Sequence, residues 1–259
     1  MKISFFIKFF TTILMLLLLS IGTMVYQAFG IQNDIAISEH HRYRSLLLAS
    51  ELFQSSEDLT RMARTYVITG NPVYKHHFFE ILDIREGIKP RPKNYSATYW
   101  HLMEAGKDSV TGQGKAVSLL EMMDNEGFSE QEIALMREAK VNADKLAGLE
   151  KQAIEALSGL YDDGHGNFTI HHAPDREFAI DLLFGEQYTA RKAAIMVPIQ
   201  QFTELLDIRT RARVNDELAR LHRQILLVMV FIVIALSALA VTIFYMRRTM
   251  LRPLVQLHG

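Results

Sequence analysis

The side chains between residues 83 and 100, "DIREGIKPRPKNYSATYW", are of types that can bind an anion. This stretch combines four basic and three aromatic residues: Arg85, Lys89, Arg91, Lys93, Tyr95, Tyr99 and Trp100. A guanidinium fork can hold a carboxylate or phosphate through two hydrogen bonds, and aromatic rings supply apolar contact around it. Arginines of the preceding segment, at 61 and 64, lie close enough in sequence to join such a pocket. The sequence therefore predicts a candidate ligand pocket made of Arg61, Arg64, Arg85, Arg91, Tyr95, Tyr99 and Trp100.

The same stretch has a second interpretation, as a corner between helices. Pro90 and Pro92 favour an extended path, because proline fixes φ and disfavours helix at the residue before it. The basic residues would then be solvated or paired with Asp83 and Glu86, and the aromatic rings would pack on neighbouring helices. From the residues alone, both interpretations stay open.

Other clusters of reactive residues carry weaker signals. Neighbouring histidines occur at 40–41, 76–77 and 171–172, but adjacent residues on a helix point about 100° apart and rarely chelate one ion. The segment "DDGHGNF" lacks the spacing of a calcium loop, so we expect a flexible loop there. No phosphate-binding loop, nucleophile elbow or kinase catalytic loop occurs. We predict no metal site, no cofactor and no catalytic domain in this chain.

Composition narrows the class of protein further. The chain has 259 residues, a net charge of −1 and no cysteine. The absence of cysteine excludes disulfides and thiolate metal sites. A near-neutral balance gives no basic field of the kind that nucleic-acid binding requires. We therefore expect no nucleic-acid partner.

Two apolar segments dominate the ends of the chain. No charged residue occurs from Phe9 to Asn33 or from Gln224 to Met246. Roughly 20 apolar residues are enough to cross a bilayer as a helix. The first segment exceeds the ~7–15 apolar residues of a signal peptide and no clear cleavage site follows it. We interpret it as an uncleaved anchor, and both segments as membrane spans in contact with the lipid bilayer.

Basic residues near the spans indicate the orientation. Lys2 and Lys8 precede the first span, and three arginines, Arg247, Arg248 and Arg252, follow the second. This favours cytoplasmic termini. Five further arginines crowd the other end of the second span, but the charge rule weakens for long translocated loops. We predict a multi-pass protein of the bacterial inner membrane with both termini in the cytoplasm.

The intervening segment is typical of a helical bundle. There is no glycine or proline from Ile31 to Thr69, and "TGNP" then predicts a helix end. Short helices are expected over about 72–85, 96–105 and 114–125. The capping box of "FSEQEI", with Ser129 and Glu132, predicts the start of a long helix that continues to about Leu160.

The last helix is expected to begin near Pro174 and to kink or restart at Pro198. An apolar stripe through Val214, Leu218 and Leu221 then continues without a breaker into the second span. The predicted fold class is all-α, with two transmembrane helices bracketing an extracytoplasmic bundle. The predicted regions are an N-terminal tail and first span (1–30), a periplasmic sensor bundle (31–224), a second span (225–246) and a final segment (247–259).

Two resemblances suggest a function. "RRTMLRPLVQL", with Arg252 and Pro253, resembles the start of a HAMP relay. "LTRMARTYVITGNPVY", "ILDIREGIKPRPKNYSATYW", "GFSEQEIALM" and "AAIMVPIQQF" resemble segments in the input regions of bacterial hybrid sensor histidine kinases, GGDEF diguanylate cyclases and nucleotide cyclases, over about residues 59–202. The resemblance implies a sensory module whose parent is a sensor histidine kinase or cyclase. It identifies neither the ligand nor the output enzyme.

The expected function is therefore the input module of a transmembrane signalling receptor. An unknown small molecule or periplasmic protein would bind the bundle, and a homodimer would pass a helix movement through the relay residues Val214, Leu218, Leu221, Arg252 and Pro253. Two alternatives remain: a chemoreceptor input, and a membrane-anchored interaction protein without a relay.

Overall fold

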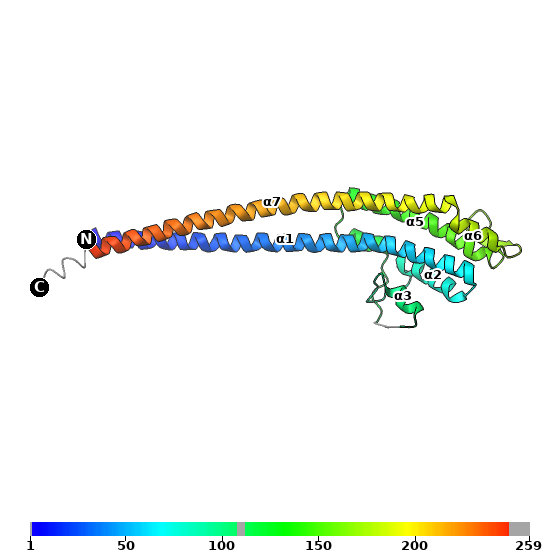
Figure 1. Ribbon diagram of the computed structural model, residues 1–259. Coiled ribbons are helices and arrows are strands. Elements are labelled where there is room, and N and C mark those ends of the chain that lie inside the picture. Colours follow the sequence, from blue (N-terminus) through cyan, green and yellow to red (C-terminus); the bar gives the residue numbers. More distant parts are fainter. Residues whose placement is uncertain (1, 108–111, 249–259) are drawn as a thin grey trace. The chain divides into compact units, whose positions relative to one another are not determined.

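The computed structural model describes residues 2–107 and 112–248, and 79% of these are helical (Figure 1). The predicted all-α class is confirmed. In chain order the elements are α1 (Lys2–Thr69), α2 (Pro72–Arg85), α3 (Tyr99–Glu104), α4 (Leu119–Asn125), α5 (Glu130–Ala156), β1 (Leu160–Asp162), β2 (Phe168–His171), α6 (Arg176–Phe184) and α7 (Glu186–Met246).

The chain divides into two compact units. We call His41–Ile208 the bundle unit. The span unit contains α1 up to His40 and α7 from Arg209 onward. In the span unit α1 and α7 run side by side, and Gln224 Nε2 donates to Gln27 Oε1 at 3.3 Å (Figure 1).

The end of α1 is set by local backbone chemistry. Gly70 has φ +70°, a conformation that glycine adopts without strain, and its N–H donates to the Tyr66 carbonyl at 2.7 Å. The side chain of Asn71 then caps α2 by accepting from the Val73 N–H, with Pro72 at the first helical position. The predicted helix end and the predicted 72–85 helix are both confirmed.

The two short helices that follow are shorter than predicted. The segment before α3 pairs with the segment before α4. The Arg91 N–H donates to the Lys115 carbonyl at 3.2 Å, and the Gly114 N–H donates to the Arg91 carbonyl at 2.6 Å. Backbone groups used in this pairing are not available for helical hydrogen bonds. As a result α4 starts only at Leu119. α3 starts at Tyr99, after a turn in which the Tyr99 N–H donates to the Ser96 carbonyl at 2.9 Å.

The capping box of α5 is confirmed. The Ser129 hydroxyl accepts from the Glu132 N–H at 3.3 Å, and the Glu132 carboxylate accepts from the Ser129 N–H at 2.7 Å. The helix ends at Ala156, before the predicted Leu160, because Gly159 has φ +73° and the chain turns there into β1.

The expected loop at "DDGHGNF" is the turn of a hairpin that the sequence did not predict, with residues 163–167 between its two strands. β1 and β2 form an antiparallel hairpin. Asp162 Oδ1 accepts from the N–H groups of Gly164 and Gly166, and Asp163 Oδ1 accepts from those of His165 and Asn167. These local hydrogen bonds satisfy the turn and hold the pKa of the Asp163 carboxyl below its usual value.

The last helical segment is interrupted at a different place from the one predicted. α6 begins after Asp175, whose side chain accepts from the Phe178 N–H at 2.9 Å. Gly185, in an extended conformation, separates α6 from α7. α7 then continues through Pro198, so the expected restart at that proline does not occur.

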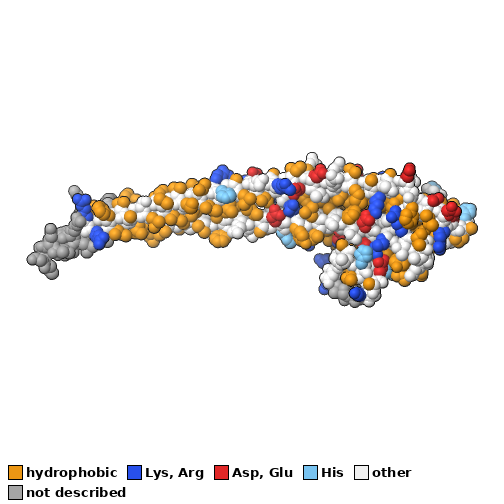
Figure 2. Space-filling model, viewed as in Figure 1, with side chains coloured by type: hydrophobic (Ala, Val, Ile, Leu, Met, Phe, Trp, Pro, Cys, Tyr) orange, Lys and Arg blue, Asp and Glu red, His pale blue; other side chains and the backbone are white. Residues whose placement is uncertain are grey.

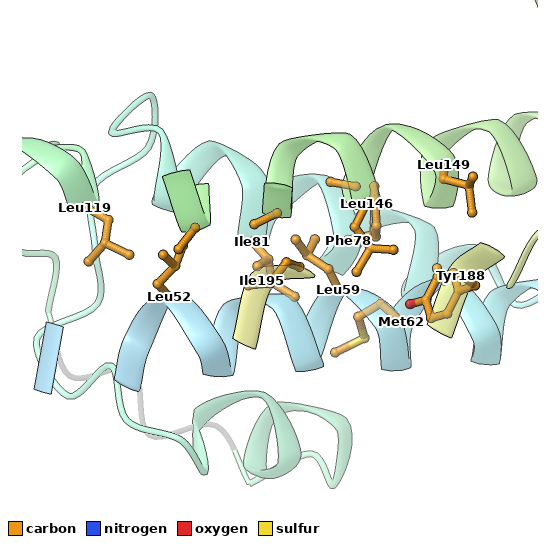
Figure 3. Packing of buried hydrophobic residues seen from close by; sticks show 14 of the residues in the cluster. Leu52, Leu59, Met62, Phe78, Ile81, Leu119, Leu146, Leu149, Tyr188 and Ile195 are labelled. Carbon is orange, nitrogen blue, oxygen red and sulfur yellow. The ribbon is translucent and has the colours of Figure 1, made fainter. Parts of the chain in front are cut away.

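The core of the bundle unit is formed mainly by side chains from α1, α2, α5 and α7, joined by Trp100 of α3, Leu119 of α4 and Leu183 of α6 (Figure 3). Buried residues of these four helices that meet in the core are Leu52, Leu59 and Met62 of α1, Phe78 and Ile81 of α2, Leu146 and Leu149 of α5, and Tyr188 and Ile195 of α7. The long helices are therefore fixed to one another by burial of apolar surface, the dominant favourable term in folding.

The helices of the span unit have a different surface. α1 and α7 contain segments long and apolar enough to cross a membrane, with mean hydropathies of 2.1 and 3.0. Their large apolar side chains point outward, and Figure 2 shows hydrophobic atoms over most of the visible face of these helices. Exposed apolar surface of this extent is not stable in water and indicates contact with lipid or protein.

Candidate functional site

The seven predicted pocket residues lie around more than one cavity. Tyr95 lines a first cavity, Arg85 lies beside a second, small one, and Arg61 and Arg64 line a third. Three of the four arginines have carboxylate partners. Arg91 Nη1 donates to Glu51 at 2.6 Å, Arg85 Nη2 donates to Asp144 at 2.9 Å, and Arg61 pairs with both Asp58 and Glu104.

Arg64 differs from the other three. Its Nη2 donates to the Leu183 carbonyl at 2.7 Å, and its guanidinium carbon lies 4.4 Å from the Phe184 ring centre and 4.8 Å from that of Tyr188. Its Nε is buried without a hydrogen-bond partner. No carboxylate among the described residues forms an ion pair with this arginine, so it retains binding capacity for an anion.

The predicted aromatic residues form one cluster. Trp100 is buried and its indole N–H donates to the Tyr95 hydroxyl at 3.0 Å. Its ring centre lies 5.1 Å from that of Tyr99 in an edge-to-face arrangement. Burial raises the pKa of Tyr95, so the hydroxyl stays protonated at neutral pH. Trp100 therefore anchors the segment that follows the two prolines to the core.

The first cavity has a volume of about 330 Å³ and lies along α1, facing Tyr95 and Met122. We call it the acidic cavity because Glu51 and Asp58 contribute its carboxylates. Burial raises the pKa of Glu51 in spite of the nearby Arg91 guanidinium. Both carboxylates already hold an arginine, which reduces the charge available to a ligand.

The third cavity has a volume of about 420 Å³ and is lined by residues of α1, α3 and α7. We call it the mixed-charge cavity, because charged groups of both signs line it: Glu57, Asp58, Arg61, Arg64 and Lys192. Lys192 of α7 pairs with Glu57 of α1 at 2.9 Å. A ligand in this cavity would contact both of the helices that continue into the span unit.

Beside this cavity lies a buried polar cluster that the sequence did not reveal. The Tyr188 hydroxyl lies 2.6 Å from Glu150 Oε1 and 2.7 Å from Thr60 Oγ1, and Thr60 Oγ1 lies 2.9 Å from both Glu150 Oε1 and the Ser56 carbonyl. The Tyr188 and Thr60 hydroxyls carry one proton each, so together they can donate in only two of these four contacts. A proton on Glu150 satisfies a third contact, in agreement with burial, which raises the pKa of Glu150 to about 7.

Sequence reasoning missed this cluster because Glu150 follows Leu149 on a helix rich in glutamate. The single available signal was its place between apolar stripe positions 149 and 153. The partners at 60 and 188 are too distant in sequence to be assigned from a pattern. Within residues 2–107 and 112–248 no group of three or more histidine, aspartate or glutamate side chains is placed to hold a metal ion.

The predicted relay residues are only partly within the described chain. Val214, Leu218 and Leu221 lie on α7, whereas Arg252 and Pro253 lie outside the described residues. Comparisons with protein-family models, with curated proteins and with solved structures found no match for this chain.

Proposed function

We propose that this chain is the input module of a bacterial transmembrane signalling receptor. The observation that carries the proposal is helix continuity. α1 and α7 each run unbroken from core residues of the bundle unit into an apolar segment of a length that can cross a bilayer. A continuous helix rises about 1.5 Å per residue and transmits a shift or rotation that a flexible linker would dissipate.

The contacts between α1 and α7 inside the bundle unit supply the element on which a signal acts. Lys192 pairs with Glu57, the Tyr188 hydroxyl contacts Thr60, and Arg42 pairs with Asp207 at 2.9 Å. A ligand or partner protein that prefers one arrangement of these contacts shifts the population toward it. The change passes along α7 through Val214, Leu218 and Leu221.

In this proposal the bundle unit lies outside the cytoplasm of a bacterial cell and both termini lie inside. The segment with Arg252 and Pro253 begins a HAMP relay to a histidine kinase or cyclase core, and the receptor works as a homodimer. The basic residues that flank the apolar segments support this orientation.

Cysteine labelling in intact cells tests the orientation. The chain has no native cysteine, so single cysteines at Asn94 and Arg248, both exposed, report cleanly. An impermeant maleimide should label Asn94→Cys in cells with a permeabilised outer membrane, and Arg248→Cys only after lysis. Equal labelling of both positions before lysis would reject the receptor proposal.

A flexible insertion in α7 tests the relay. Five glycine and serine residues placed after Arg209 interrupt the helix between the two units while leaving the bundle core intact. In a fusion to a diguanylate cyclase core, output should lose its dependence on changes in the bundle unit. Retained dependence would reject the relay through α7. Output that is insensitive to changes in the bundle unit even without the insertion would instead support an interaction protein without a relay.

A further inference from the structure

We infer that the mixed-charge cavity is a binding site for a small zwitterion of the α-amino acid type, with the ligand carboxylate on Arg64 and Lys192 and its ammonium group on Glu57. The signalling role of this site rests on the proposed function, whereas the binding itself does not. The cavity volume of about 420 Å³ is within the range of small-molecule sites.

Arg64 supplies the fixed positive charge of the site. The Phe184 and Tyr188 rings and the Leu183 carbonyl hold its guanidinium in place. An arginine held in this way loses little side-chain entropy on binding, and charge-assisted hydrogen bonds to a carboxylate are among the stronger polar contacts. The other guanidinium in the cavity, that of Arg61, is already neutralised by Asp58 and Glu104.

The Lys192–Glu57 pair determines that the ligand carries both charges. A simple anion that attracts Lys192 leaves the half-buried Glu57 carboxylate without its partner, which costs free energy. A zwitterion replaces both halves of the pair, because its ammonium group takes the place of Lys192 on Glu57. The side chains of the pair are 27% and 35% exposed, so the exchange does not require opening of the core.

The position of the cavity connects an occupant to α7. Lys192 lies one helical turn after Tyr188, which contacts Arg64, Thr60 and Glu150. Thr60 itself lines the cavity. An occupant therefore changes two of the contacts that join α7 to α1, at Lys192 and at the Arg64–Tyr188 stack.

Titration calorimetry on the full chain in lipid nanodiscs tests this inference. The probes are L-alanine, L-serine and L-glutamate, with acetate and ethylamine as ligands that carry one charge each. We expect at least one of the amino acids to bind at least tenfold more tightly than acetate or ethylamine. The absence of binding by all three amino acids, or equally tight binding of acetate, overturns the inference.

Two variants and a matched control assign the binding to this cavity. Lys192→Gln and Glu57→Gln should each weaken amino-acid binding about tenfold or more. Lys75→Gln removes a lysine of nearly equal exposure (28%) that pairs with Glu155 at 2.8 Å and lines none of the cavities described above, and it should leave binding unchanged. An unaltered affinity in both cavity variants, with unaltered melting temperatures, places the ligand elsewhere and rejects the site.

The result is independent of the receptor proposal. Binding in nanodiscs requires neither a particular orientation in the cell nor a relay. Loss of the predicted labelling pattern with retained amino-acid binding rejects the receptor and keeps the site, and the opposite pair of outcomes rejects only the site.

Discussion

The two units use the same long helices with opposite arrangements of apolar side chains. In the bundle unit, Leu52 and Leu59 of α1 are each 1% exposed, whereas Leu16 and Leu19 of the same helix are 60% and 67% exposed in the span unit. A continuous apolar surface is stable only if the surrounding medium is also apolar. The comparison indicates that one part of α1 packs in a protein core and that the other contacts an apolar medium, lipid or a partner protein.

The largest expected effect comes from placing arginine at exposed valines of the span unit, compared with exposed valines of the bundle unit. Val230 and Val233 of the span unit are 52% and 62% exposed, and Val141 and Val197 of the bundle unit are 50% and 54% exposed. Replacing Val230 and Val233 by arginine should cost about 5–7 kcal/mol of membrane insertion. Because α1 still anchors the chain, the readout is topology: a cysteine at Arg248 should become accessible to the impermeant maleimide before lysis.

The matched control is the variant Val141→Arg/Val197→Arg, which should fold normally and keep a cysteine at Arg248 protected from the maleimide until lysis. If both double variants behave alike, the difference in solvent between the units is rejected, because exposure and residue type are the same.

Next in size is the loss of a large core side chain. Phe78 is fully buried, so Phe78→Ala should lower the free energy of unfolding of the bundle unit by about 3–5 kcal/mol. The only tryptophan, Trp100, is buried in this unit and reports its unfolding by fluorescence. Phe53→Ala, at a more exposed position, should cost about 1 kcal/mol or less.

Protonation of Glu150 should make the stability of the bundle unit depend on pH. The ordinary pKa of glutamate is 4.5, and burial raises that of Glu150 to about 7. Between these values the folded chain binds more protons than the unfolded chain, so the free energy of unfolding falls as pH rises. The contribution is full below pH 4.5 and is lost as pH rises through about 7, a change of up to about 3 kcal/mol.

Denaturant titrations across this pH range measure the effect. Glu150→Gln should remove most of the slope, because glutamine keeps an acceptor for Tyr188 and does not titrate. Glu138→Gln, at an exposed position of the same helix, should retain it. A wild-type slope in the Glu150 variant contradicts the assignment of the raised pKa to this group.

The smallest expected effect concerns a helix end. Ser129→Ala removes the acceptor for the Glu132 N–H and should destabilise the bundle unit by about 1 kcal/mol in denaturant titrations. Ser96→Ala, at an exposed position outside a helix cap, provides the comparison and should change the stability little. Equal effects in both variants would show that the capping box is not needed for stability.

Features that depend on neighbouring residues could be predicted from the sequence. The helix end at Gly70, the start of α2 at Pro72 and the capping box of α5 all follow from backbone chemistry within a few residues. The apolar segments of α1 and α7 were equally evident, because their length and composition alone decide whether they can cross a bilayer.

Features that depend on residues distant in the sequence could not be predicted from the sequence. The sequence placed Arg85 and Arg91 in one pocket with Arg64, but ion pairing with Asp144 and Glu51 assigns the first two to different surroundings. The hairpin at β1 and β2 was missed, because its turn depends on aspartate side chains that accept from several backbone N–H groups at once.

The amino-acid sequence by itself determined the helical class, the two apolar segments and several helix ends, because these follow from short-range backbone chemistry and from local hydrophobicity. Only the tertiary structure decided which charges meet. Residues 57 and 192, or 60, 150 and 188, come together through packing of α1, α5 and α7, and no periodicity along the chain encodes those distances.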